Sequence, residues 1–312
     1  MKNNTLRIGT RGSQLALWQA NWIKKQLIRT HPDLDIQIVT IKTTGDKILD
    51  VPLAKVGGKG LFVKEIESAL LEGSIDLAVH SMKDVPTDLP EGLGIVAVTD
   101  REDPRDAVLG RDRTPILDLP RGAKIGTSSL RRQAQLLAVR EDFVLEPLRG
   151  NVNTRLRKLR EGMYDAIILA MAGVKRLGWE QEVTEILDPG TMLPAIGQGA
   201  LGIEARLDDG ATLERISFLD DEVTHSCVLS ERSFLHRLEG GCQVPIAAYA
   251  VREGDDVILT GLVASVDGRN VVRDMDRAPA SGARELGTAL ASRILDSGGR
   301  RILEEVYCRE MN

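Results

Sequence analysis

Cys242 stands in a segment that is suited to presenting a thiol. It follows Gly240 and Gly241 and precedes Pro245, at the foot of an expected helix and ahead of an expected strand. Two residues without side-chain bulk before a cysteine, and a proline soon after it, are typical of a loop that exposes a sulfur atom. Free cysteine is more often a small buried apolar residue, so the segment alone leaves both interpretations open.

Basic residues gather at the expected starts of three helices, where the helix dipole disfavours positive charge. They are Arg11 before Ser13, Arg131 and Arg132 after Ser128-Ser129, and Arg149 with Arg155 around Asn151. Guanidinium groups and free backbone N–H groups together bind carboxylates or phosphates strongly. One such arginine is usually a solvated surface charge, whereas the clustered set favours an anion-binding site.

A further candidate functional residue, the carboxylate of Asp84, follows the apolar run Leu77-Ala78-Val79. Asp84 lies at the carboxyl end of this expected central strand, beside Lys83 and before Pro86. There it could form a structural ion pair with Lys83, or it could face a cleft and move a proton or stabilise a cation. His80 in the same segment is more typical of a packed histidine than of a base.

The glycine-rich stretch from Thr43 to Phe62 is either a disordered connection or a lid over a binding cleft. It does not have the spacing of a phosphate-binding P-loop. On the second interpretation the cleft or lid residues are Lys55, Lys59, Phe62, Ser81 and Gln198.

The bulk composition is that of a globular enzyme. The 312 residues are 42% hydrophobic and 28% charged, with a net charge of -5, so we expect no general nucleic-acid affinity. The sequence offers no cluster of histidines and cysteines, so we expect no metal. Three cysteines without metal-ligand spacing predict a reducing compartment rather than a disulfide framework. The start predicts no signal peptide, and no apolar run is long enough to span a membrane, so we expect a cytoplasmic protein.

Two pairs of similar segments within the sequence predict a duplicated architecture. The stretch 8–15 is loosely repeated at 125–132, and 72–79 is echoed at 161–168. Helices alternating with apolar strands indicate parallel sheets. We therefore expect an α/β fold with two similar doubly wound lobes joined by a hinge, as in periplasmic binding proteins, at residues 1–99 plus 200–216 and 100–199.

The chain beyond residue 217 differs from both lobes. A helix over 225–238, three alternating strands broken near 253–256 and 267–270, and helices near 281–297 and 299–307 predict a small α+β domain at 217–312. Cys242 leads its first strand.

Taken together, these stretches resemble the porphobilinogen deaminase (hydroxymethylbilane synthase) family. Six motifs occur in the family's order over nearly the whole chain, and jointly they are very specific: Gly9 to Ser13, Ala78 to Pro86, Gly126 to Arg132, Leu148 to Arg155, Gly197 to Gly199 and Glu239 to Cys242. One small departure is Gln14, where many members have proline.

The resemblance implies head-to-tail polymerisation of four porphobilinogen molecules to the linear hydroxymethylbilane, with release of ammonia, on a dipyrromethane primer. It implies a thioether from this cofactor to Cys242 and a catalytic role for Asp84 at the pyrrole nitrogens. We also expect a monomer with no metal and no nucleic-acid or membrane partner. The implied carboxylate-binding positions are Arg11, Ser13, Lys83, Thr127, Ser129, Arg131, Arg132, Arg149 and Arg155.

Two alternatives remain open on the sequence. A non-catalytic bilobal anion-binding protein has the same plan of two lobes and a hinge, although the third domain with its cysteine counts against it. A different cysteine-nucleophile transferase would need a base near the thiol, and His225 and His236 are the only nearby candidates in sequence.

Overall fold

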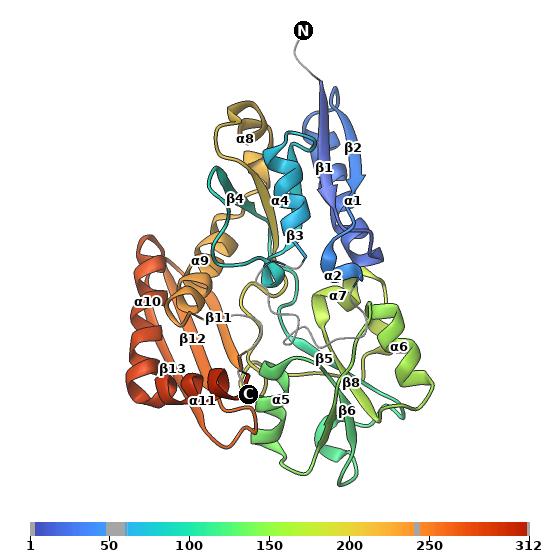
Figure 1. Cartoon of the computed structure of the whole chain (residues 1–312), viewed down its shortest axis with the longest axis vertical. Coiled ribbons are helices and arrows are strands. Elements are labelled where there is room, and N and C mark those ends of the chain that lie inside the picture. The colour runs from blue at the N-terminus through green and yellow to red at the C-terminus, as the bar shows by residue number, and fades with distance from the viewer. Residues whose placement is uncertain (1–3, 48–59, 61, 240–243, 311–312) are drawn as a thin grey trace. The chain divides into compact units, whose positions relative to one another are not determined.

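The computed structural model describes residues 4–47, 60, 62–239 and 244–310 of this mixed α/β protein (Figure 1). The chain forms two compact units. The first holds residues 4–47, 60, 62–102 and 200–225, and the second holds 103–199, 226–239 and 244–310. The chain thus leaves the first unit after residue 102 and returns to it at residue 200. The predicted division into three domains near residues 99, 199 and 217 stays a prediction.

The first unit is built on a five-stranded sheet in the order β2-β1-β3-β10-β4. Its strands and helices are β1 (Thr5–Thr10), α1 (Gln14–Thr30), β2 (Asp35–Thr40), α2 (Thr44–Lys47), α4 (Lys64–Leu71), β3 (Leu77–Ser81), β4 (Leu93–Val98), β10 (Leu201–Arg206) and α8 (Gly210–Ile216). Strands β1, β2 and β3 are parallel, whereas β10 is antiparallel to both β3 and β4. The expectation of parallel sheets thus holds for β1, β2 and β3, whereas β10, which the chain enters on its return from the second unit, runs in the opposite direction.

The second unit contains a sheet of the same plan, in the order β7-β6-β8-β5-β9. Its elements are β5 (Asp106–Gly110), β6 (Lys124–Gly126), α5 (Leu130–Val139), β7 (Val144–Glu146), α6 (Val152–Arg160), β8 (Ala166–Ala170), α7 (Met171–Arg176) and β9 (Glu185–Ile186). Here β5 is the antiparallel strand, against β8 and β9. The two orders correspond strand for strand, with β5 in the place of β10, which confirms two similar α/β lobes.

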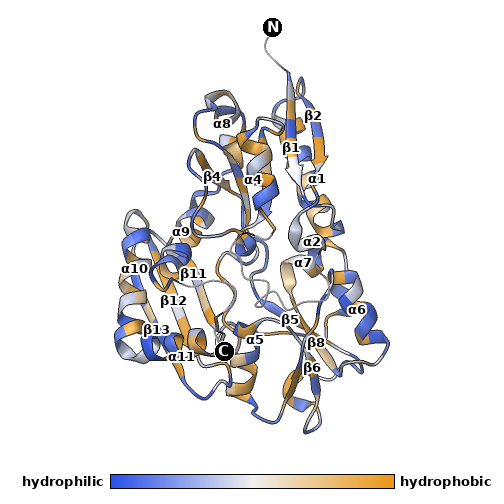
Figure 2. Ribbon diagram, in the orientation of Figure 1, coloured by the Kyte–Doolittle hydropathy of each residue, from blue (hydrophilic) through white to orange (hydrophobic). Residues whose placement is uncertain are grey.

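The similar segments of the sequence, 8–15 with 125–132 and 72–79 with 161–168, form equivalent elements of the two lobes. Strands β1 and β6 each run into a helix that starts at a serine N-cap, Ser13 for α1 and Ser129 for α5. Helices α4 and α6 each end before a glycine with positive φ, Gly73 at 69° and Gly162 at 77°, and a buried strand follows. A left-handed glycine ends a helix without steric cost. Figure 2 shows the apolar β8 beside a mostly hydrophilic α6.

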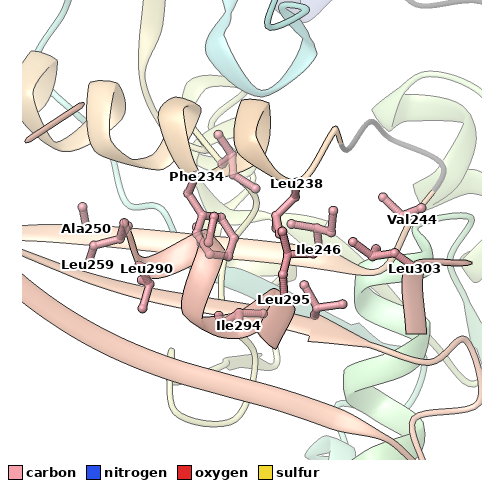
Figure 3. Packing of buried hydrophobic residues seen from close by; sticks show 14 of the residues in the cluster. Phe234, Leu238, Val244, Ile246, Ala250, Leu259, Leu290, Ile294, Leu295 and Leu303 are labelled. Carbon is pink, nitrogen blue, oxygen red and sulfur yellow. The ribbon is translucent and has the colours of Figure 1, made fainter. Parts of the chain in front are cut away.

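A separate three-stranded antiparallel sheet in the order β11-β12-β13 follows. Its elements are α9 (Glu222–Arg237), β11 (Ile246–Glu253), β12 (Asp256–Ala264), β13 (Val271–Pro279), α10 (Ala283–Ile294) and α11 (Arg300–Glu310). Figure 3 shows Phe234 and Leu238 of α9 in one buried cluster with Leu259 and Ile294. This order of helix, three strands and two helices confirms the predicted α+β part of the chain.

Close helix packing in this cluster depends on one glycine. A Cβ atom on Gly287 of α10 would lie 2.2 Å from the Ser230 carbonyl oxygen and 2.8 Å from the Phe234 nitrogen of α9. Only a residue without a side chain allows the two helix backbones to approach so closely.

The same sheet supports helix α5. The buried residues Ala134 of α5 and Leu262 of β12 belong to one apolar cluster with Leu193. At the β12–β13 turn, a Cβ atom on Gly268 would lie 2.4 Å from the Ala134 carbonyl oxygen. The turn therefore packs directly on the helix that carries Arg131 and Arg132.

Candidate functional site

A short turn presents Asp84 at the carboxyl end of β3. The strand leads into one 3-10 turn, Met82–Asp84, in which the Val85 N–H donates to the Met82 carbonyl at 3.2 Å. Met82 is buried and its N–H donates to the Ala200 carbonyl at 3.1 Å, so the turn is anchored to the start of β10.

The Asp84 side chain is exposed. Within the described residues no ion pair or hydrogen bond joins the Asp84 carboxylate, so the structural pair with Lys83 that the sequence left open does not form. The carboxylate is available to a ligand. Ser81 lies at the end of β3, half-buried.

Behind this turn, His80 belongs to a buried polar cluster. Its Nε2 lies 2.8 Å from Oε2 of Glu204, and the two side chains are only 5% and 1% exposed. Glu67 of α4 is also buried. Burial, together with the Glu204 charge, raises the pKa of Glu67 above its usual 4.5, although His80 and Lys64 oppose the shift. His80 is thus a packed histidine with a partner, as its position in the sequence predicted.

Glu67→Gln should change stability in a pH-dependent way. A carboxyl group with a raised folded pKa contributes stability below its unfolded pKa, and this contribution is lost as the pH rises through the folded pKa. The amide does not ionise, so the variant should gain stability relative to the unaltered chain between pH 4 and pH 8. Urea unfolding of both proteins at pH 4, 6 and 8 measures this, and a difference that does not vary with pH would refute it.

Arg11 and Ser13 both lie at the start of α1 in the first unit. Ser13 is the N-cap, and its Oγ accepts the Ala16 N–H at 3.2 Å. The guanidinium carbon of Arg11 stands 4.1 Å from the centre of the Phe62 ring, a cation–π contact. Phe62, predicted as a lid residue, is therefore in contact with a predicted carboxylate-binding arginine.

The start of α5 in the second unit is open to an anion. The N-cap Ser129 makes no side-chain hydrogen bond to the described first turn, and its own N–H donates to Thr127 Oγ1 at 3.2 Å. Thr127 is buried and Ser129 is half-buried. Without a side-chain cap, the first backbone N–H groups of this helix are left for a ligand.

Arg131 and Arg132 converge on one buried carboxylate, that of Asp106 at the start of β5. Arg131 Nη1 lies 2.8 Å from Asp106 Oδ2, and Arg132 Nη2 lies 2.7 Å from Asp106 Oδ1. Gln198 joins them through Nε2, which donates to Oδ1 at 2.9 Å. Burial would raise the pKa of Asp106, but the two guanidinium groups outweigh it and hold that pKa far below its usual value.

The remaining predicted arginines lie around the start of α6. Asn151 caps this helix, with Oδ1 accepting the Thr154 N–H at 2.9 Å. Arg155 in its first turn donates from Nε to the Gly150 carbonyl at 2.9 Å. Arg149 is half-buried, just before the cap.

Three predicted residues, Cys242, Lys55 and Lys59, lie outside the described residues. The other two cysteines have different settings: Cys227 is 4% exposed in the apolar cluster around Phe234, and Cys308 is exposed on α11.

Among the described residues, no group of three or more histidine, cysteine or acidic side chains is arranged to hold a metal ion. In the same part of the chain, no helix is both long and apolar enough to cross a membrane.

Sequence reasoning missed Asp106 and the carboxylates of Glu67 and Glu204. The one available signal for Asp106 was an acidic residue directly before the apolar run Ala107-Val108-Leu109. For Glu204 the same signal exists, since it stands inside the apolar strand β10. A charge within a buried strand needs a partner, although the sequence does not say which one.

Comparison with solved structures finds distant likenesses to periplasmic binding proteins. The periplasmic aliphatic sulphonate binding protein SsuA from Escherichia coli has a TM-score of 0.41 and 16% identity, covering 76% of this chain and 71% of its own. A periplasmic binding protein of Salmonella typhimurium with high arginine specificity has a TM-score of 0.40 and 14% identity, covering 71% of this chain and 93% of its own.

Comparison of sequences gives a much closer match. The chain is 59% identical to the porphobilinogen deaminase of Trichlorobacter lovleyi, covering 100% of this chain and 99% of that protein. It is equally 59% identical to the porphobilinogen deaminase of Geobacter sulfurreducens, with 100% and 98% covered. Residues 6–214 match the family described as "Porphobilinogen deaminase, dipyromethane cofactor binding domain", and 225–296 match "Porphobilinogen deaminase, C-terminal domain". With both domains present in order, the chain belongs to the porphobilinogen deaminase family.

Proposed function

We propose that this chain is a hydroxymethylbilane synthase, a transferase of tetrapyrrole biosynthesis. It joins four porphobilinogen molecules head to tail and releases one ammonia for each, and one water then cleaves the product from the primer and supplies the hydroxyl group of the linear hydroxymethylbilane. The observation that carries this function is the full-length similarity to porphobilinogen deaminases, over both domains. The exposed Asp84 and the buried arginine cluster supply chemistry that suits it.

Asp84 is the catalytic carboxylate of this proposal. The C–N bond of the substrate's aminomethyl group breaks, and the nitrogen leaves with the bonding electrons, takes a proton and departs as ammonia. This leaves an azafulvene cation on the substrate. A carboxylate beside the pyrrole N–H lowers the energy of that cation and can accept the proton that the attacking pyrrole carbon loses as the new C–C bond forms. The Asp84 carboxylate has no competing partner within the described residues, which supports this role.

The second unit fits a dipyrromethane cofactor. Each pyrrole ring carries an acetate and a propionate, and the α5 start offers an uncapped helix end beside two arginines with one counter-charge. Bound there, the dipyrromethane supplies the nucleophilic pyrrole carbon to which the first substrate is joined. We assign its thioether to Cys242, which ends the family-like motif Glu239-Gly240-Gly241-Cys242; the packing of Cys227 in an apolar core supports this choice.

The arginines divide into two roles. Arg131 and Arg132 hold the cofactor carboxylates, while Arg11 and Arg149 hold those of the growing chain; Ser13, Lys83, Thr127, Ser129 and Arg155 complete the carboxylate-binding set. The mixture of guanidinium groups, hydroxyls and helix starts suits repeated carboxylates.

Leucine substitutions should separate these roles. Arg131→Leu or Arg132→Leu should leave the protein without primer, whereas Arg11→Leu or Arg149→Leu should keep the primer and stall with partly extended chains. Mass spectrometry of each intact variant before and after addition of porphobilinogen measures both properties. If all four variants carry primer and turn over normally, these arginines are only structural or surface charges.

The protein is further proposed to act in the cytoplasm as a monomer on its small-molecule substrate, without nucleic-acid or membrane partners. Size-exclusion chromatography with light scattering tests the oligomeric state directly.

The activity itself is tested by its stoichiometry. Purified protein incubated with porphobilinogen should release one ammonia per porphobilinogen consumed and accumulate a linear tetrapyrrole. Binding of porphobilinogen without ammonia release would instead support a bilobal anion-binding protein.

A further inference from the structure

The buried cluster formed by Asp106, Arg131, Arg132 and Gln198 has an unbalanced charge. Two guanidinium groups and one carboxylate sum to +1 (+2 and −1), while Gln198 is neutral. The arginine side chains are 6% and 7% exposed and Asp106 is 0% exposed. Burial, and to a smaller extent Arg132, lower the pKa of Arg131, while Asp106 opposes them. Positive charge held away from water in this way favours the binding of an anion.

The two arginines are bonded differently. Arg132 uses all three of its nitrogens within the protein: Nε and Nη2 donate to Asp106 Oδ1, and Nη1 donates to the Ile168 carbonyl at 2.9 Å. Arg131 uses Nη1 alone, toward Asp106 Oδ2 and the Leu193 carbonyl at 2.7 Å. Its Nε and Nη2 make no bond to the part of the chain that the structure describes, and these donors remain for a ligand.

Asp106 contacts both arginines through its carboxylate. If it is removed, two like charges remain buried side by side, and each long side chain is free to turn away from the other. An arginine held by a fixed carboxylate is oriented in advance, which reduces the cost of binding an anion.

We propose that Asp106 is the positioning residue of the cofactor site. It braces Arg132, orients the open donors of Arg131, and holds the cluster at the +1 charge that one cofactor carboxylate neutralises. Gln198 assists by donating to Asp106 Oδ1, the oxygen that Arg132 also contacts. This inference rests on the proposed dipyrromethane-dependent function and adds to it a residue that does not itself contact the ligand.

The test compares Asp106→Asn with a matched control, Asp142→Asn. Asp142 also pairs with an arginine in the second unit, Arg140 at 2.7 Å, but near the surface. Each apoprotein is freed of primer, checked for its fold by circular dichroism, and incubated with porphobilinogen. The fraction that carries primer is followed by intact mass.

Asp106→Asn should acquire primer more slowly than the unaltered chain by on the order of tenfold to a hundredfold, since misplacement of a binding group by about 1 Å can have effects of this size. Asp142→Asn should match the unaltered chain. Primer acquisition by folded Asp106→Asn at the normal rate, or faster, would overturn the inference; a faster rate would mean that Asp106 competes with the ligand rather than orienting its arginines.

If Asp106→Asn does not fold, Gln198→Met replaces it. This variant removes the Nε2 hydrogen bonds to Asp106 Oδ1 and to the Pro104 carbonyl and keeps every charge, so it should fold and acquire primer several-fold more slowly; a normal rate would count against the inference. Measurements on the unaltered chain distinguish failure of this inference from failure of the proposed function. If the unaltered chain is active but never carries primer, the proposed function is wrong, whatever the variants do.

Discussion

Asp84→Asn is expected to fold and to carry its primer, yet to extend it on the order of a hundredfold more slowly than the unaltered chain. The amide keeps the shape of the side chain and can still bond to a pyrrole N–H, but it has no charge to stabilise the cation that forms as ammonia leaves. Loss of one well-placed electrostatic partner typically has an effect of this size. The exposed position of Asp84 after β3, without a partner in the described residues, means that stability should hardly change.

The measurement is single-turnover extension on primed protein, with thermal unfolding alongside. Asp84→Glu keeps the charge but displaces it by one methylene, so it should be slow rather than inactive. Asp88→Asn, an exposed aspartate in the loop that follows, serves as the control and should extend normally. Near-normal extension by Asp84→Asn would show that its charge is not catalytic.

Cys242→Ser is expected to abolish both the primer and the activity. Serine has nearly the same size, but its hydroxyl is far less nucleophilic than a thiolate, so the thioether cannot form. Because all extension starts from the primer, activity should fall below detection while the fold is kept. Intact mass and product formation measure the two effects.

The other two cysteines provide the controls for this substitution. Cys308→Ala should be indistinguishable from the unaltered chain, since this thiol is exposed on α11. Cys227→Ala should keep primer and activity and lose about 1 kcal/mol of stability, because a buried apolar contact is removed. Loss of primer in either alanine variant, with Cys242 intact, would place the attachment elsewhere.

Local signals in the sequence were enough to predict much of the architecture. The glycines after α4 and α6 and the serine caps of α1 and α5 act within a few residues of chain, so the equivalent elements of the two lobes could be recognised. The position of Asp84 was predictable for the same reason, since an apolar strand ends just before it.

Contacts between distant parts of the chain could not be predicted in the same way. Asp106 lies 26 residues from Arg132, and His80 lies 124 residues from Glu204. Asp106 follows Arg101-Glu102-Asp103-Pro104-Arg105, a run that is typical of a solvated loop. Only the return of the chain through β5 and β10, antiparallel to their neighbours, brings these charges into buried positions.

The central claim is that a dipyrromethane bound through Cys242 is the primer on which four porphobilinogen molecules are joined. The most direct test is the intact mass of purified protein before and after addition of substoichiometric porphobilinogen. The account predicts a starting mass above that of the chain by two pyrrole units, followed by a ladder of additions of one pyrrole unit each, with both absent in Cys242→Ser. Active protein with the mass of the bare chain and no such ladder would contradict it.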